Sequence, residues 1–315
     1  MRPIGGYFEL ELAHGQSHHP DAIALNTGRN CLEYVLRARH YRHVYVPYYT
    51  CEVILEPMQK LGVTWSFYGI DRHLELAEDI RLQPDEALLA TNYYGLKQAH
   101  IEALAARYGQ QLIVDNTQAF FARRIDGIDT FYTCRKFFGV PDGAYLYCDK
   151  PLDLELEQDQ SWERMDYLLK RVDLSPEAGY NDFRARSEQL VGNNIRRMSA
   201  LTQRMMASID YDCAAQRRRE NYAQLDAALH MTNGIHLQLD ENAVPMVYPY
   251  LADDIDLRKR LIDNKIYVAQ YWPNVLDWSP KDSIEQQLTT HLAALPIDQR
   301  YGTAEMEHII TLINH

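Results

Sequence analysis

The chain of 315 residues is acidic, with 32 Lys and Arg residues against 44 Asp and Glu residues and a formal net charge of −12. This charge argues against general binding to nucleic acid or to an anionic membrane surface. A hydrophobic content of 46% is ample for a core, and the length suits one large α/β domain with a smaller one appended.

The cysteines and the histidines give no sign of a metal site or a disulfide framework. The five cysteines are odd in number and lack paired metal-ligand spacing, which predicts a reducing compartment, the cytoplasm. Glu9 and Glu11 interrupt the first apolar stretch, so we expect neither a signal peptide nor a membrane anchor. His14, His18 and His19 lie in a loop with Gly and Ser, and we expect no metal there.

The first 150 residues alternate short apolar runs with helical patterns, which predicts a parallel sheet with helices on its faces. Strand patterns occur at residues 44–46, 65–68, 87–91, 112–114 and 144–147. Helical patterns occur at residues 29–39, 51–61 and 98–108. Gly109 follows the last of these as a C-cap.

The character of the sequence changes from about residue 151. Polar helical patterns follow an acidic stretch, at residues 161–171, 182–206 and 212–230. Two arginine runs within them, Arg196-Arg197 and Arg217-Arg218-Arg219, are interpreted as solvated helix faces.

The C-terminal part combines strand patterns with a final helix. The strand patterns cover residues 235–239, 246–250 and 266–269, and the helix covers residues 303–313. We therefore expect a large domain over residues 1–180, with connecting helices and a small α/β domain over residues 181–315. A site between the two parts would be natural.

Lys136 and Asp115 are a pair of candidate site residues. Asp115 ends a buried strand pattern, and Lys136 follows it among aromatic residues such as Phe131 and Phe137. Apolar surroundings lower the pKa of an amine, and a neutral amine can condense with an aldehyde cofactor. An acid at a strand end can keep the ring nitrogen of such a cofactor protonated. The pair therefore suggests a pyridoxal phosphate site. The alternative is that Lys136 snorkels from a strand edge and Asp115 forms a turn.

Several short motifs follow one another in an order typical of a known family. They are Gly5-Gly6-Tyr7-Phe8, Asn26-Thr27-Gly28-Arg29-Asn30, Val46-Pro47-Tyr48-Tyr49-Thr50, Tyr94-Gly95, Asp115-Asn116-Thr117-Gln118, Lys136, Asp142-Gly143, Arg219-Glu220-Asn221-Tyr222 and Leu295-Pro296-Ile297-Asp298. On these motifs the chain resembles the fold-type-I pyridoxal phosphate aminotransferases of the DegT/StrS (nucleotide-sugar aminotransferase) family. The resemblance implies a large, mainly parallel sheet domain with helices on both faces and a smaller C-terminal α/β domain.

The resemblance also implies roles for single residues. Lys136 would bind the cofactor aldehyde and move the proton, Asp115 would pair with the pyridine nitrogen, and Gln118 would bond the ring oxygen. Thr27, Gly28 and Arg29 would cradle the cofactor phosphate with backbone amides at a helix start. The alternative for Thr27-Gly28 is a plain turn and N-cap.

The chain departs from the family pattern at two positions. Phe131 stands five residues before the lysine, where the family commonly has a serine that binds phosphate. We assign that role instead to Thr133, by likeness to other fold-type-I aminotransferases. Cys51 stands where an aromatic residue would stack on the ring, and Tyr49 or Tyr48 would substitute unless they are core residues.

The implied function is an aminotransferase with two half-reactions. An amino acid, by family analogy glutamate, would give its nitrogen to the cofactor, which would pass it to a keto-sugar or related carbonyl acceptor in surface polysaccharide or sugar biosynthesis. Arg135 and Arg300 are candidates for binding the donor carboxylate, although each is also explicable as an ordinary surface or loop residue. Asn181 is the candidate to reach the phosphate of a partner subunit, in an implied homodimer.

Three alternatives to an aminotransferase stay open. A pyridoxal-dependent sugar dehydratase of this family would have histidine at the lysine position, so Lys136 argues against it. A non-catalytic binding or regulatory protein would explain the altered positions at Phe131 and Cys51. A plain Rossmann nucleotide binder is disfavoured because no G-x-G-x-x-G follows the first strand. The chain is also short for the family, with little room for loops that grip a nucleotide-sugar.

Overall fold

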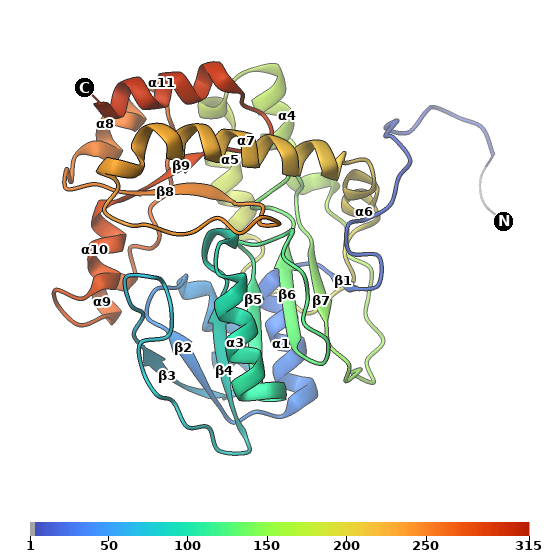
Figure 1. Ribbon diagram of the computed structural model, residues 1–315. Helices are drawn as coiled ribbons and strands as arrows, with labels where there is room; N and C mark the ends of the chain where they lie inside the picture. Colours follow the sequence, from blue (N-terminus) through green and yellow to red (C-terminus); the bar gives the residue numbers. More distant parts are fainter. Residues whose placement is uncertain (1–3, 315) are drawn as a thin grey trace.

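The computed structural model describes residues 4–314, and its main element is a seven-stranded sheet (Figure 1). The strand order is β1-β7-β6-β5-β4-β2-β3. Within the sheet, β7 is antiparallel to both neighbours and the remaining pairs are parallel. The strands are β1 (Ile23–Leu25), β2 (His43–Pro47), β3 (Thr64–Tyr68), β4 (Glu86–Thr91), β5 (Leu112–Asn116), β6 (Asp129–Thr133) and β7 (Ala144–Tyr147). The predicted α/β class with a mainly parallel sheet is confirmed.

Helices cover both faces of this sheet. They are α1 (Gly28–Arg39), α2 (Glu56–Leu61) and α3 (Gln98–Tyr108). Successive residues of β4 point to opposite faces, so that Leu89 joins the core beneath α1 and Leu88 joins the core beneath α3. A strand buried on both faces reads as a continuous apolar run, which is why the inner strands are recognisable in the sequence.

The remaining chain is mainly helical and carries a second, two-stranded sheet. Its elements are η4 (Trp162–Arg164), α4 (Asp166–Asp173), α5 (Pro176–Glu188), α6 (Ala200–Ala207), α7 (Tyr211–Leu229), β8 (Val247–Leu251), α8 (Leu257–Asp263), α9 (Val275–Trp278), α10 (Ile284–His291), β9 (Leu292–Pro296) and α11 (Thr303–Asn314). Short 3-10 turns are η1 (Glu52–Ile54), η2 (Tyr93–Gly95), η3 (Gly109–Gln111) and η5 (His230–Thr232). In Figure 1 the C-terminal elements lie over one end of the large sheet.

Hydrogen bonds join this C-terminal part to loops of the large sheet. The N–H of Met246 donates to the carbonyl of Tyr94 at 2.8 Å. The side chain of Asn274 donates to the carbonyl of Thr50 at 2.9 Å. Both acceptors follow a strand of the parallel sheet, so the C-terminal part covers the edge where the carboxyl ends of the strands meet.

Three sequence predictions about these elements are wrong. The helical pattern at residues 182–206 is interrupted, because α5 ends at Glu188 and α6 begins at Ala200. Gly192, at φ 72°, and the asparagines after it favour a turn over a continuing helix. The patterns at residues 235–239 and 266–269 belong to no strand. Ile235 nevertheless packs in the core. The alternation of apolar and polar residues at 235–239 therefore reflects an extended segment that buries one side without pairing with another strand.

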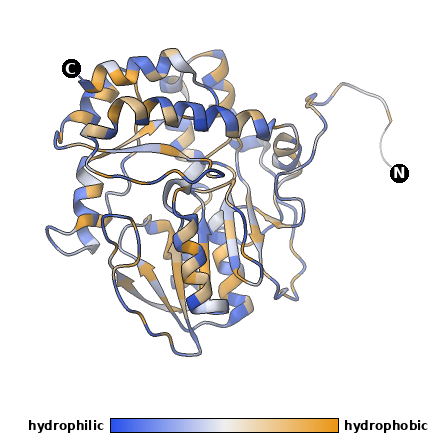
Figure 2. Ribbon diagram, viewed as in Figure 1, coloured by the Kyte–Doolittle hydropathy of each residue, from blue (hydrophilic) through white to orange (hydrophobic). Residues whose placement is uncertain are grey.

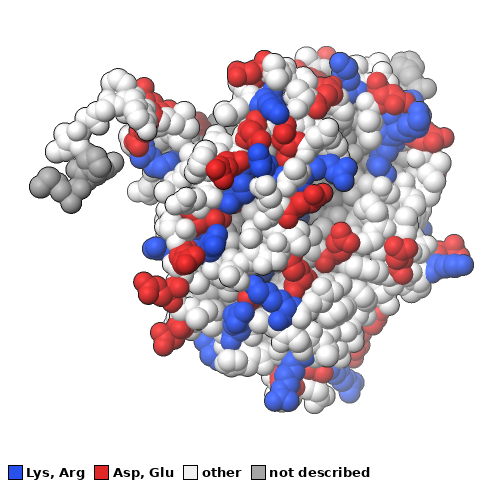
Figure 3. Space-filling view, turned by 180° about the vertical axis from the view of Figure 1, so that it is seen from behind, with Lys and Arg blue, Asp and Glu red and all other residues white. Residues whose placement is uncertain are grey.

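The surface is polar with locally paired charges. Figure 2 shows hydrophobic residues gathered on the central strands, whereas the outer helices carry both kinds of residue. Figure 3 shows acidic and basic side chains interspersed over one face. Ion pairs on the molecule include Arg186 with Asp166, at 2.8 Å. No helix within residues 4–314 combines the length and apolarity that crossing a bilayer requires.

Candidate active site

A cavity of about 260 Å³ opens at the carboxyl ends of β4, β5 and β6. In parallel sheets this edge is the usual place for a ligand. The register pairs Thr91 of β4 with Asp115 of β5, and Asp115 with Phe131 of β6, so these residues lie side by side. Eight of the predicted site residues line the cavity: Thr27, Gly28, Arg29, Asp115, Gln118, Thr133, Arg135 and Lys136.

Lys136 stands in a turn directly after β6, and its amine faces the cavity. Its Nζ atom donates a hydrogen bond to the hydroxyl of Thr117 at 3.0 Å. The side chain is open to the cavity, but the surrounding walls withdraw it from bulk water. This desolvation lowers the pKa of Lys136 below its ordinary value, while Asp115 and Cys51 oppose the shift. The desolvation therefore shifts the balance toward the neutral, nucleophilic amine.

Asp115 is the last residue but one of β5 and is 5% exposed. Its Oδ1 atom accepts a hydrogen bond from the N–H of Thr117 at 2.8 Å. Burial raises the pKa of Asp115, whereas Lys136 and Thr117 favour the ionised form. Thr117 thus connects the acid and the amine of the site, through its backbone on one side and its hydroxyl on the other.

Three buried side-chain atoms of residues that line the cavity lack a partner within residues 4–314. They are Nε2 of Gln118, the hydroxyl oxygen of Thr91 and Nε of Arg135. The other end of the Gln118 amide is held, because its Oε1 atom accepts from the N–H of Tyr94 at 2.8 Å. Buried polar groups are normally hydrogen-bonded, so this fixed and unpaired donor indicates a ligand acceptor in the cavity.

The N-terminus of α1 forms another wall of the cavity. Thr27 is the N-cap, and its hydroxyl accepts from the N–H of Asn30 at 3.2 Å. Gly28 lets the backbone approach closely, since a Cβ atom there would lie 3.3 Å from Thr117 and 3.8 Å from Phe131. The Arg29 guanidinium pairs with Glu56, so Arg29 offers its backbone. Free N–H groups and the helix dipole at this end suit an anion.

Arg135 reaches the cavity next to Lys136. Its Nη2 atom donates to the hydroxyl of Ser187 at 2.9 Å, and its guanidinium lies 5.6 Å from the ring centre of Phe183. Its Nε atom is buried and has no partner among the described residues. A guanidinium anchored at one nitrogen and unpaired at another is suited to bind a carboxylate.

Three predicted site residues do not line this cavity. Tyr49 is fully buried, packs 5.1 Å from the ring of Trp272, and bonds the hydroxyl of Tyr94. Asn181 is exposed on α5. Arg300 lines a neighbouring cavity of about 630 Å³ and pairs with Asp298 at 2.7 Å. The structure thus places Tyr49 in the core, the alternative weighed for it, while the roles of Asn181 and Arg300 stay predictions.

Trp272 is a cavity residue that the sequence analysis does not identify. It comes from the loop before α9 and lines the wall together with Cys51 and Thr50. It supplies an aromatic ring to a cavity in which Cys51 replaces the expected one. Its segment carries no motif, and only the packing of the C-terminal part brings it there.

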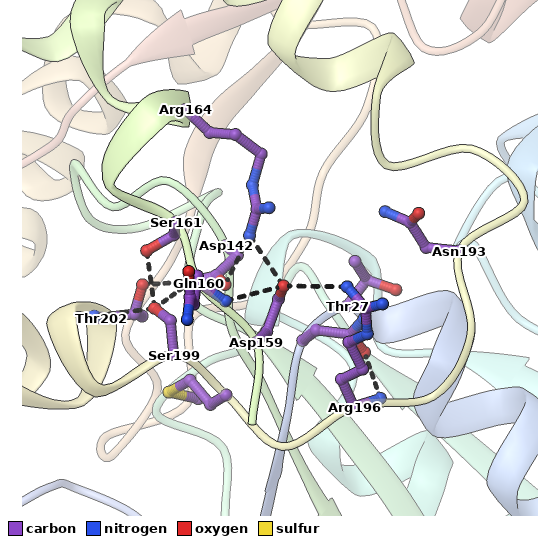
Figure 4. A network of polar contacts seen from close by, with 12 residues as sticks. Thr27, Asp142, Asp159, Gln160, Ser161, Arg164, Asn193, Arg196, Ser199 and Thr202 are labelled. Carbon is purple, nitrogen blue, oxygen red and sulfur yellow. Dashed lines mark hydrogen bonds and ion pairs between the residues drawn. The ribbon is translucent and has the colours of Figure 1, made fainter. Parts of the chain in front are cut away.

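A network of buried polar groups supports the backbone on the side of α1 and β7 (Figure 4). Asp142 accepts from Arg164 at 3.1 Å and from Ser199 at 3.2 Å, and it also bonds the hydroxyl of Thr202. The next residue, Gly143, donates its N–H to the carbonyl of Asn26 at 2.7 Å. The network therefore holds the turn that leads into Thr27 and α1.

No protein family model and no curated protein sequence matches the chain. Solved structures do. A DegT DnrJ EryC1 StrS aminotransferase from Brucella abortus has 16% identity and a TM-score of 0.63, over 93% of this chain and 85% of that one. The sugar aminotransferase CalS13 from Micromonospora echinospora has 14% identity and a TM-score of 0.63, over 93% and 87%. NtdA from Bacillus subtilis, with bound cofactor PMP, has 14% identity and a TM-score of 0.61, over 93% and 73%.

These likenesses define the class of fold. The chain has the fold-type-I fold of pyridoxal phosphate-dependent transferases. More particularly, it shares the fold of the DegT/DnrJ/EryC1/StrS sugar aminotransferases, as the order of its motifs implies.

Proposed function

We propose that the protein is a pyridoxal phosphate-dependent aminotransferase that moves an amino group from an amino acid to a keto-sugar or related carbonyl acceptor in surface polysaccharide or sugar biosynthesis. The observation that carries the proposal is the hydrogen-bonded line Lys136, Thr117, Asp115 in the cavity beyond β5. The names of the structural neighbours support the same class of reaction. Glutamate is the first donor to test.

The residues present fit pyridoxal phosphate. The unpartnered Nε2 atom of Gln118 would donate to the ring oxygen, and Asp115 would pair with the ring nitrogen. Thr27 and Gly28 would hold the phosphate with the N-terminus of α1, and Thr133 lines the same cavity. The bound cofactor supplies an electron-withdrawing ring that stabilises negative charge on the substrate carbon.

Residues of the chain would supply the catalytic base, the negative charge beside the ring nitrogen and the cover that excludes water. The Nζ atom of Lys136 would take a proton from the donor carbon and later return it, which requires the neutral amine that desolvation favours. Ionised Asp115 would keep the ring nitrogen protonated. Trp272 and the loop that carries it would cover the cavity from the C-terminal part.

Arg135 would bind the carboxylate of the amino donor. Its buried and unpartnered Nε atom supports this role, whereas both prongs of the Arg300 guanidinium bond Asp298. Replacing Arg135 with Met should raise KM for glutamate roughly tenfold to a hundredfold, since a hydrogen bond to a charged group is worth about 1.5–3 kcal/mol. The exposed Arg184 of α5 offers the control R184M. Equal KM values in R135M and R184M would remove Arg135 from the proposal.

We also propose a cytoplasmic homodimer. Apolar side chains on the α4–α5 hairpin support it, because Val172 is 84% exposed, Leu174 68% and Tyr180 58%. Asn181 lies in the same hairpin, where a partner subunit could meet it. The five unpaired cysteines support a reducing compartment. The mass in solution, measured by light scattering, tests the dimer directly, and a monomer would contradict it.

The function is tested by the visible absorption spectrum of the protein with pyridoxal phosphate, before and after glutamate. Wild type and the control K259A should develop a band that K136A lacks; Lys259 is 76% exposed and far less enclosed. Bleaching of that band by glutamate would support the donor reaction. A band that persists after glutamate is added would still support Lys136 as the reactive lysine but would exclude glutamate as the donor. A spectrum that is the same in K136A would favour a non-catalytic protein.

A further inference from the structure

Arg218 lies in the middle of α7 and is buried, with 1% of its surface exposed. The interpretation of Arg217-Arg218-Arg219 as a solvated helix face is therefore wrong for Arg218. The hydrogen-bond partners of its guanidinium are uncharged oxygen atoms. Burial lowers the pKa of Arg218 to about 10. A buried cation among neutral partners is costly, so its position needs a reason.

The partners of Arg218 connect it to the turn of the candidate catalytic lysine. Its Nη2 atom donates to the carbonyl oxygen of Phe137, the residue that follows Lys136, at 3.3 Å. Its Nη1 atom donates to the carbonyl of Met246 at 3.0 Å, just before β8. The guanidinium also lies 4.5 Å from the ring centre of Phe137. One side chain thus touches both the lysine turn and the small sheet.

Gln299 bonds the same carbonyl oxygen from another direction. Its Nε2 atom donates to Phe137 at 2.9 Å, and its Oε1 atom accepts from Nε of Arg218 at 3.0 Å. Gln299 comes from the loop between β9 and α11. Arg218, Gln299 and the Phe137 carbonyl therefore close a ring of hydrogen bonds, which we call the Phe137 clamp.

The other backbone hydrogen bonds of Phe137 and Phe138 are local. The N–H groups of Phe137 and Phe138 both donate to the carbonyl of Cys134, at 3.1 and 2.9 Å, and these bonds lie within the turn itself. Lys136 belongs to neither a strand nor a helix. The clamp thus joins the backbone of this turn to the C-terminal part, in addition to the side-chain bond from Arg135 to Ser187. A charge-assisted bond is stronger than a neutral one.

We propose that Arg218 and Gln299 are positioning residues that hold the backbone of Lys136 for reaction and couple it to the placement of the C-terminal part. Neither residue acts on the substrate. The inference rests on the proposed role of Lys136. The cavity of about 630 Å³ is lined by Lys136, Arg218 and Gln299, so open space adjoins the turn. Loss of the clamp would let the turn shift into that space.

The test compares R218M, R218K and Q299L with R219M in the full-length protein. Met keeps much of the length of Arg without its donors, and Lys keeps the charge. Arg219 is the matched control, since it neighbours Arg218 on α7 but donates to Ala243, at 3.0 Å, away from the lysine turn. Two quantities are measured: hydrogen exchange of the peptide covering residues 134–140 without added cofactor, and the rate at which the lysine-dependent absorption band forms with pyridoxal phosphate.

R218M and Q299L should each speed exchange of that peptide and slow formation of the band by about tenfold, the effect of one net hydrogen bond of about 1.4 kcal/mol. R218K should recover part of both, and R219M should match wild type. If R218M and Q299L match R219M in the two measurements, the clamp does not position the lysine. Should R218M fail to fold, Q299L and R218K decide the question. Absence of the band in wild type would refute the proposed function, whereas exchange would still report on the clamp.

Discussion

The Nζ atom of Lys136 lies 3.0 Å from the hydroxyl oxygen of Thr117 and donates a hydrogen bond to it. This hydroxyl favours the charged amine, because an ammonium group is a stronger hydrogen-bond donor than a neutral amine. Desolvation lowers the pKa of Lys136, and the charge of Asp115 opposes that shift. The balance of these effects sets how much neutral amine is present.

Replacing Thr117 with Val should lower the pKa of Lys136 further. The change removes one hydrogen bond to the charged amine and leaves the desolvation in place. The rate at which Lys136 reacts with pyridoxal phosphate, followed against pH, reports the shift. T117S keeps the hydroxyl and should restore the wild-type profile. A T117V profile that coincides with wild type would show that the hydroxyl has no influence on the amine.

Replacing Asp115 with Asn should slow transamination by about a hundredfold, a typical loss for removing one charge aimed at a reacting group. Because burial raises the pKa of Asp115, wild-type activity should fall with acidification at a pH above the ordinary carboxyl range. The acid limb should be absent from D115N. The control is D126N, since the Asp126 side chain is 93% exposed. If the activity of D115N falls at the same acidic pH as that of wild type, a group other than Asp115 causes the fall.

The sequence predicts the residues around β5 well for a physical reason. Asp115 lies at the carboxyl end of β5, Gln118 follows β5 and Lys136 follows β6. Parallel strands bring such residues to one edge of the sheet. The inner strands can be recognised as apolar runs because helices cover both faces of the sheet. Thr27 predicts the start of a helix at Gly28, because its hydroxyl caps α1.

Residues placed by distant packing are not predictable in this way. Trp272 reaches the cavity, and Arg218 becomes buried, only when the C-terminal part lies over the large sheet. Local pattern indicates a solvated face for Arg218, since an arginine run normally faces water. The sequence alone is consistent with either a ring-stacking role or a core role for Tyr49. Its contacts with Tyr94 and Trp272 place it in the core. The domain division at residue 180 stays a prediction.

Thr27→Ala should both destabilise the fold and weaken cofactor binding. Loss of an N-cap costs about 1 kcal/mol of the free energy of unfolding. Ser283 provides a matched control, because it caps α10 through the N–H of Gln286, outside the residues that line the cavity. S283A should lose similar stability in denaturant unfolding, while only T27A should bind pyridoxal phosphate more weakly. If T27A and S283A bind pyridoxal phosphate with equal affinity, Thr27 serves only as a helix cap.

Trp272 should report the arrival of the cofactor by its fluorescence. It lines the cavity, so pyridoxal phosphate bound there would lie within efficient quenching distance of its ring. Trp162 is 66% exposed and lines a different hollow, which makes W162F the matched control. Titration with pyridoxal phosphate should quench wild type and W162F strongly, whereas W272F should lose most of the quenching. Comparable quenching in W272F would place the cofactor away from this wall, and the loop before α9 would then have no part in covering it.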